Sequence, residues 1–108
     1  MKEQNGIKLF AKGDALPPLP PGLSADIPVS SKFGFKVAET DGKAHWIAAG
    51  EKEYRAAEAQ RLGINPEKVS IDRLCLMISP LQCAGLCGFG ACTLAYDPQR
   101  NYYYCTCF

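Results

Sequence analysis

The sequence predicts an α+β fold with a small N-terminal β-hairpin plus helix and a C-terminal disulfide-linked helix and β-hairpin. Residues 32–49 alternate apolar and polar side chains around Asp41-Gly42, a pair typical of a two-residue hairpin turn. Residues 51–62 are rich in alanine and long unbranched side chains, which favour a helix. All six cysteines lie between residues 75 and 107, so we expect the C-terminal part to be linked covalently.

Length and charge limit the classes of function. The 108 residues suffice for one small domain with a modest core. Twelve Lys and Arg residues against eleven Asp and Glu residues give a net charge of +1. A nucleic-acid-binding protein needs a basic surface for phosphate contacts, so we expect no nucleic-acid partner.

Composition divides the chain into three segments. Residues 1–31 are expected to form a proline-rich arm, because the run at residues 16–22 favours polyproline II. Residues 32–74 are expected to form a ββα unit that serves as a pro-region or leader. Residues 75–108 are expected to form a cysteine-rich module.

Two signals about the compartment disagree. Lys8 and Lys12 interrupt the apolar residues near the N-terminus, so no signal-peptide core is visible. The longest unbroken apolar run, residues 74–78, is too short to span a membrane. Clustered cysteines in a small domain nevertheless indicate disulfides and an oxidising compartment. We therefore expect cytoplasmic synthesis, then secretion or export after processing by an alternative route.

The N-terminal unit is expected to continue from the hairpin into helices. Its return strand covers residues 44–48, and the helix over residues 51–62 ends at Gly63, a common C-terminal stop. Asn65-Pro66 matches a cap followed by a proline in the first turn. Apolar residues then recur at helical spacing, which predicts a second helix up to Ile78, although β-branched residues at its start also permit a strand.

The cysteine-rich segment is expected to contain a short helix and a hairpin. Ser and Pro at its start predict a helix over residues 79–87, and Gly88 can end it. Residues 92–96 and 102–107 are rich in strand-forming residues and flank a proline-containing turn at residues 97–101.

Cysteine spacing relates this helix to the last strand. Cys83 and Cys87 are four residues apart, so on a helix they share one face, roughly 6 Å apart along the axis. Cys105 and Cys107 are two apart, so on a strand they share one face, roughly 6.6 Å apart. Because these separations match, two side-by-side disulfides could link the helix to the strand.

The cysteine order C…CxxxC…GxC…CxC, with Gly90-Ala91-Cys92 as the GxC and Cys105-Thr106-Cys107 as the CxC, resembles that of the cysteine-stabilised αβ peptides, the defensins and related toxins. The resemblance covers about the last third of the chain. It implies a helix tied to the last strand by two disulfides, with a third bridge nearby. The implied pairs are Cys75–Cys92, Cys83–Cys105 and Cys87–Cys107. This segment is neutral, whereas members of that family are often cationic.

These features predict a non-enzymatic precursor of an exported, disulfide-stabilised peptide effector with a defence or toxin-like role. We expect no catalytic residue, no cofactor and no metal ligand. The target, a protein or a membrane, stays undefined, and a processing protease or modifying enzyme is an expected partner. A contact surface is expected at the C-terminal aromatic residues Tyr102, Tyr103, Tyr104 and Phe108. Since successive strand residues face opposite ways, Tyr103 or its two neighbours should be exposed.

Two other functions stay open at this point. The composition break near Cys75 also fits a ribosomally synthesised precursor peptide with an N-terminal leader and an enzymatically modified Cys-rich core. The chain could instead be a thiol metal-binding protein. Cys83 and Cys87 loosely match zinc-ligand spacing, and Cys105 and Cys107 could chelate a soft ion.

Overall fold

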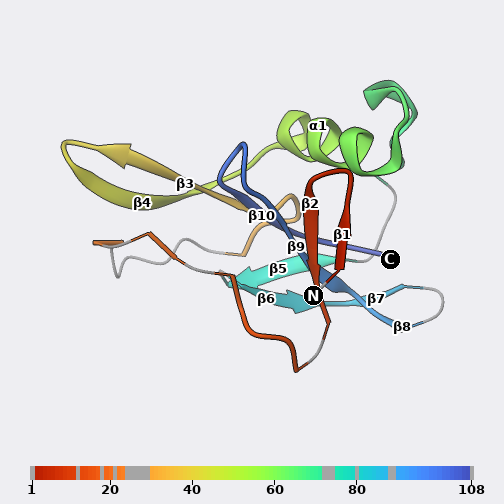
Figure 1. Ribbon diagram of the computed structural model, residues 1–108, viewed down its shortest axis with the longest axis horizontal. Helices are drawn as coiled ribbons and strands as arrows, with labels where there is room; N and C mark the ends of the chain where they lie inside the picture. The colour runs from red at the N-terminus through yellow and green to blue at the C-terminus, as the bar shows by residue number, and fades with distance from the viewer. Residues whose placement is uncertain are drawn as a thin grey trace.

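A six-stranded antiparallel sheet dominates the computed structural model of the protein (Figure 1). The structure describes residues 2–11, 13–17, 19–20, 22–23, 30–71, 75–79, 81–87 and 90–107. The strand order is β1-β2-β9-β10-β3-β4. These strands are β1 (Lys2–Gln4), β2 (Ile7–Phe10), β3 (Phe35–Thr40), β4 (Lys43–Ala48), β9 (Thr93–Asp97) and β10 (Tyr102–Thr106). The predicted α+β class is therefore wrong: the fold is mostly β, and α1 (Glu51–Leu62) is the one α-helix in the described part of the chain.

The N-terminal hairpin lies within the segment that was expected to be an arm. Strands β1 and β2 are joined by Asn5-Gly6, whose φ angles of 51° and 87° suit a tight two-residue turn. Strand β2 then pairs with β9, where Lys8 lies opposite Tyr96. Residues from the start of the chain therefore complete a sheet built around C-terminal strands.

The predicted hairpin at residues 32–49 is confirmed as β3 and β4. Its turn residues Asp41 and Gly42 have φ angles of 53° and 76°. Strand β3 pairs with β10 only near its start, at Phe35 and Lys36. The rest of the β3–β4 hairpin consequently extends past β10, away from the other strands of the sheet (Figure 1).

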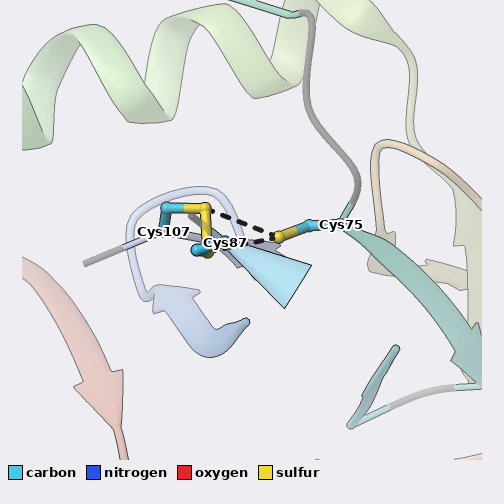
Figure 2. Close-up of side chains that lie close together, drawn as sticks. All are labelled: Cys75, Cys87 and Cys107. Atoms are coloured by element: carbon cyan, nitrogen blue, oxygen red, sulfur yellow. Dashed lines mark hydrogen bonds between the residues drawn. A yellow bond between two sulfur atoms is a disulfide. The ribbon is translucent and has the colours of Figure 1, made fainter. Parts of the chain in front are cut away.

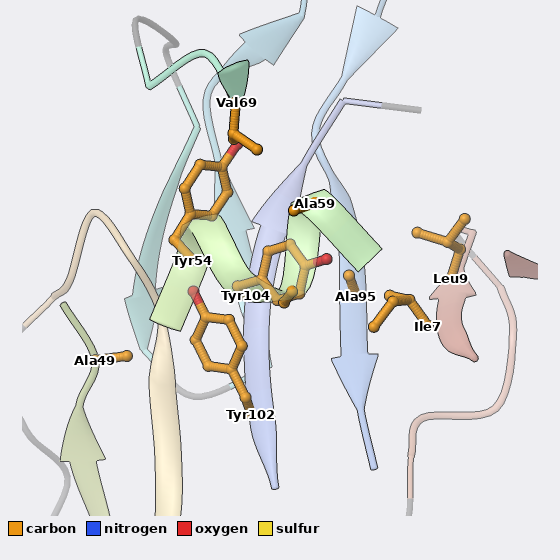
Figure 3. Packing of buried hydrophobic residues seen from close by; sticks show 10 residues of the cluster. Ile7, Leu9, Ala49, Tyr54, Ala59, Val69, Ala95, Tyr102 and Tyr104 are labelled. Carbon is orange, nitrogen blue, oxygen red and sulfur yellow. The ribbon is translucent and has the colours of Figure 1, made fainter. Parts of the chain in front are cut away.

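The predicted helix at residues 51–62 is also confirmed. The Glu53 carboxylate accepts the Gly50 N–H at 2.9 Å at the first turn, and Gly63 ends the helix with φ 69°. No helix in the described ranges is long and apolar enough to cross a membrane. Helix α1 covers one face of the sheet (Figure 3). The buried residues between them are Ile7, Leu9, Ala49, Tyr54, Ala57, Ala59, Val69, Ala95, Tyr102 and Tyr104.

Two small two-stranded sheets account for much of the cysteine-rich segment. They consist of β5 (Leu76–Ser79) with β6 (Gln82–Ala84), and β7 (Leu86–Cys87) with β8 (Gly90–Ala91). The second buried cluster joins residues of these sheets to the face of the main sheet opposite α1. Its members are Phe10, Phe35, Val37, Ala44, Cys75, Met77, Cys87, Leu94, Tyr103 and Cys105.

Of the helix predicted from Asn65 to Ile78, the described residues form a helical turn only at its start, and residues 72–74 lie outside the described part of the chain. The Asn65 side chain caps a short 3₁₀ helix, η1 (Pro66–Lys68), by accepting the Glu67 N–H at 2.9 Å. Further on, Met77 lies in strand β5 and exchanges two backbone hydrogen bonds with Ser31, of 2.9 and 3.0 Å. A distant backbone partner therefore replaces the local helical bonds.

The helix predicted at residues 79–87 is wrong too, because its described residues form β6 and β7. Leu81 and Gly85 have φ angles of 68° and 110°, outside the right-handed helical region. The strands predicted at 92–96 and 102–107 are confirmed as β9 and β10. The main sheet thus takes strands from all three sequence segments, 1–31, 32–74 and 75–108.

Replacing Gly34 by alanine tests the approach of the β3 hairpin to β10. A Cβ there would lie 2.2 Å from the Tyr103 carbonyl oxygen and 2.9 Å from the Tyr104 Cα, at φ 84°. We expect Gly34→Ala to lower the free energy of unfolding by about 3 kcal/mol or more in urea titrations.

Gly42→Ala is the matched control, because Gly42 also has a positive φ but a Cβ there meets no atom within 4 Å. Gly42→Ala should lower the free energy of unfolding by only about 1 kcal/mol. Equal losses in the two variants would contradict the close packing of Gly34 against β10.

Candidate functional site at the cysteine cluster

Strand β10 presents different chemistry on its two faces. Tyr102, Tyr104 and Thr106 face helix α1, whereas Tyr103 and Cys105 face the small sheets. Cys107 follows the strand and packs with the second group. Because successive strand residues alternate, the CxC motif directs both thiol side chains to the face opposite the helix.

Three disulfides close the cysteine-rich segment, and the described residues include no free cysteine. They join Cys75 to Cys92, Cys83 to Cys105 and Cys87 to Cys107, with Cα–Cα distances of 5.9, 5.8 and 5.7 Å. These are the pairs that the resemblance to cysteine-stabilised αβ peptides implies. The elements that carry them differ, because Cys83 and Cys87 lie on β6 and β7 instead of one helix.

The Cys75–Cys92 and Cys87–Cys107 disulfides pack against each other, and Figure 2 shows Cys75 beside the Cys87–Cys107 bond. The Cys75 Sγ lies 3.9 Å from the Cys87 Sγ and 3.8 Å from the Cys107 Sγ, and the Cys87 Sγ lies 4.0 Å from the Cys92 Sγ. Disulfide sulfurs carry no proton, so these are van der Waals contacts. Cys75 and Cys87 are buried, and Cys107 is half-buried. We call Cys75, Cys87, Cys92 and Cys107 the four-sulfur cluster.

A buried polar network lies on the other face of β10, at the same end of the strand. The Glu58 carboxylate accepts hydrogen bonds from the Arg61 Nε at 2.8 Å, the Tyr104 hydroxyl at 2.7 Å and the Thr106 hydroxyl at 2.8 Å. Glu58 and Arg61 are only 3% and 4% exposed. Donors on three residues, with the Arg61 Nη2 as a fourth donor group at 2.8 Å, therefore satisfy a carboxylate that burial alone would keep uncharged.

Arg61 connects this network to the four-sulfur cluster. Its guanidinium donates to the Cys107 carbonyl oxygen at 3.3 Å and to the Gln4 side chain at 2.9 Å. Burial lowers the pKa of Arg61, but the Glu58 carboxylate outweighs that effect and leaves the pKa raised. The guanidinium stays charged beside the chain segment that carries Cys107.

The pKa values of the network follow from competing causes. Burial raises the pKa of Glu58. The hydrogen bonds and the charge of Arg61, together with the hydrogen bonds from Tyr104 and Thr106, outweigh burial and lower this pKa below its usual value. Burial and the nearby Glu58 charge raise the pKa of Tyr104, so its hydroxyl remains a donor. The network is therefore a set of fixed charges and donors at the base of the cysteine cluster.

The predicted aromatic contact surface is not at the surface. Tyr102, Tyr103 and Tyr104 are 0%, 1% and 0% exposed, and Phe108 lies outside the described residues. The three tyrosines do alternate between faces, but both faces are covered, by α1 on one side and by the small sheets on the other. Tyr103 stacks on Tyr96 with ring centroids 4.5 Å apart. Burial raises its pKa.

The spacing of residues in α1 contains a signal for the Glu58–Arg61 network. Tyr54, Ala57, Glu58 and Arg61 recur at the spacing of one helical face, and all four are buried. An acid and a base three residues apart within an apolar stripe indicate an internal ion pair. The packing of two disulfides had no such local signal, because it depends on how four separate segments meet.

Fold and covalent chemistry define a small, mostly β protein that three disulfides stabilise. The chain is 33% identical over 94 residues to YozP of Bacillus subtilis (strain 168), described as an uncharacterized protein, with 81% of each chain covered. The chain belongs to the same family as this relative. No protein-family model and no solved structure matches the chain described here.

Neutralising Glu58 tests the buried network. Glu58→Gln leaves the Arg61 charge without its buried partner, so we expect a loss of roughly 3–5 kcal/mol of unfolding free energy at pH 7. The folded pKa of Glu58 lies below its usual value of 4.5. Its contribution is therefore fully present above about pH 4.5 and is lost as the pH falls through the folded pKa. The difference in unfolding free energy between Glu58→Gln and the wild type should therefore become smaller as the pH falls below about 4.5.

Glu51→Gln is the control for this measurement. Glu51 is half exposed and pairs with Arg55 at 3.2 Å on the surface of the same helix, so its removal should cost less than about 1 kcal/mol. Urea titrations from pH 7 to pH 3 compare the two variants. A Glu58→Gln loss as small as that of Glu51→Gln, or one that persists unchanged in acid, would refute the network.

Proposed function

We propose that the protein is an exported, disulfide-stabilised effector with a defence or toxin-like role, acting without catalysis. The observation that carries this proposal is the closure of the C-terminal segment by three disulfides. Such bonds persist in oxidising compartments and are rare in reducing ones. The pairing agrees with that of the defensins and related toxins, which supports the finer assignment; the helix of that family has no counterpart among the described residues.

We further propose that the active form is the whole chain. Strands β9 and β10 lie in the middle of the main sheet, where β2 pairs with β9 and β3 pairs with β10. A cut near residue 75 would leave the C-terminal part dependent on noncovalent pairing with the rest. On this proposal the N-terminal segments support the effector throughout its life instead of being removed from it.

Intact-mass analysis of the protein from its host tests export and oxidation together. We expect the full-length chain outside the cytoplasm, lighter by about six hydrogens than the reduced sequence because each disulfide removes two. A reductant should restore the full mass. Full-length protein with six alkylatable thiols, found only inside the cell, would contradict the proposal. A mass change that survives reduction would favour an enzymatically modified precursor peptide instead.

A growth assay tests the effector role itself. The oxidised full-length chain should slow the growth of at least one strain in a panel of bacteria, since the disulfides hold its active conformation. The same protein after reduction and alkylation is the matched control and should lose the effect. Equal growth with both preparations across the panel would argue against a defence or toxin-like role.

A further inference from the structure

Sulfurs of different disulfides in the four-sulfur cluster are separated by the distances found between ligands of a metal site. In a tetrahedral zinc site with four cysteines, zinc–sulfur distances of about 2.3 Å place neighbouring sulfurs roughly 3.8 Å apart. Three separations between the two packed disulfides are 3.8, 3.9 and 4.0 Å. The Sγ atoms of Cys75, Cys87 and Cys107 all lie within 4.8 Å of one another. Opening the two disulfides would free the three thiols that Figure 2 shows side by side, together with that of Cys92, whose Sγ lies 4.0 Å from the Cys87 Sγ.

The main sheet helps to preorganise two of the four ligands. Thr93 lies opposite Thr106 at the end of the β9–β10 pair, so Cys92 and Cys107 extend the two strands side by side. Backbone pairing of β9 with β10 sets this register. Cys75 directly precedes β5 and Cys87 lies in β7, both under the same face of the sheet.

The surroundings also suit thiolate ligands. Cys75 is 1% exposed and Cys87 is 8% exposed, so few water molecules can compete for the metal. The half-buried Cys107 offers a way in for an ion. The Arg61 guanidinium donates to the Cys107 carbonyl oxygen and so helps to hold the segment that carries one of the four ligands.

We propose that Cys75, Cys87, Cys92 and Cys107 form, when reduced, a four-thiolate site for one Zn²⁺ ion, and that oxidation by two small-molecule disulfides, each of which takes up two electrons and becomes a dithiol, exchanges this ion for two protein disulfides. In the reverse direction, two dithiol reductants supply the electrons: each protein disulfide gains two electrons and two protons, and each dithiol closes to a disulfide. Zn²⁺ then displaces four thiol protons. Cys83 and Cys105 take no part. The inference does not rest on export, because it concerns the reduced chain.

Co²⁺ titration of the full-length chain tests the site. A phosphine reduces the protein without binding the metal strongly, taking an oxygen atom from water for each disulfide it opens. The reduced chain should bind one Co²⁺ per molecule with the strong visible absorption of tetrahedral thiolate coordination, and Zn²⁺ should displace it. The oxidised chain should bind none. No such absorption in the reduced chain would overturn the proposal.

Two double variants, each keeping four cysteines, provide the matched comparison. Cys83→Ser/Cys105→Ser should bind Co²⁺ as tightly as wild type, because it keeps the four-sulfur cluster. Cys75→Ser/Cys92→Ser should bind more than about 100-fold more weakly, since a change even beyond the ligands costs 10–100-fold. Equal binding by the two variants would mean unspecific thiol chelation and would overturn the proposal.

A measurement on the wild-type chain avoids any uncertainty about whether a variant folds. X-ray absorption of the reduced, Zn²⁺-loaded chain should report four sulfur neighbours at about 2.3 Å. Fewer sulfurs, with nitrogen or oxygen atoms in their place, would contradict a four-cysteine site. If export fails its own test while these spectra are as expected, the metal site stands without the proposed effector role.

Discussion

Burial of strand β10 on both of its faces is the constraint on which the rest of the structure depends. This central strand carries large or apolar side chains on both faces, so each face needs a cover, and the two covers differ in kind. Helix α1 packs on Tyr102 and Tyr104. The small sheets pack on Tyr103 and Cys105, where disulfides tie them to the strand and its end. A chain of this size has little apolar surface to bury, so covalent links supplement its second core.

The end of β10 is fixed from both sides, and this arrangement links the fold to the cysteine chemistry. On one side Thr106 donates to the buried Glu58 carboxylate. On the other side Cys107 is bonded to Cys87. Because Arg61 reaches the Cys107 carbonyl oxygen, the polar network holds this segment in place independently of the disulfide. Cys107, one of the four proposed metal ligands, is thus held by noncovalent contacts as well as by its disulfide.

Short-range sequence signals predict the correctly placed elements of the fold. The other elements depend on contacts between residues that are far apart in the sequence. Asp41-Gly42 and Gly63 act within a few residues of themselves, so the β3–β4 hairpin and α1 could be placed. Asn5-Gly6 is the same kind of turn signal as Asp41-Gly42. It lies in the segment 1–31, whose proline run at residues 16–22 favours an extended arm instead of a hairpin. The cysteines of residues 79–87 have helical spacing, yet the described strands there belong to two short hairpins, β5–β6 and β7–β8, which disulfides tie to β10 and its end. Alternation placed the tyrosines on two faces correctly but could not reveal that both faces are covered.

Native-state hydrogen exchange tests most directly whether β10 is the element on which the fold depends. The interior amides of β9 and β10 should exchange most slowly in the oxidised protein, with protection equal to the free energy of global unfolding. Amides of α1 and of the outer half of the β3–β4 hairpin should exchange faster, since fewer contacts hold them. Protection that is highest in α1, or exchange of β10 amides at the rate of the outer hairpin, would contradict this account.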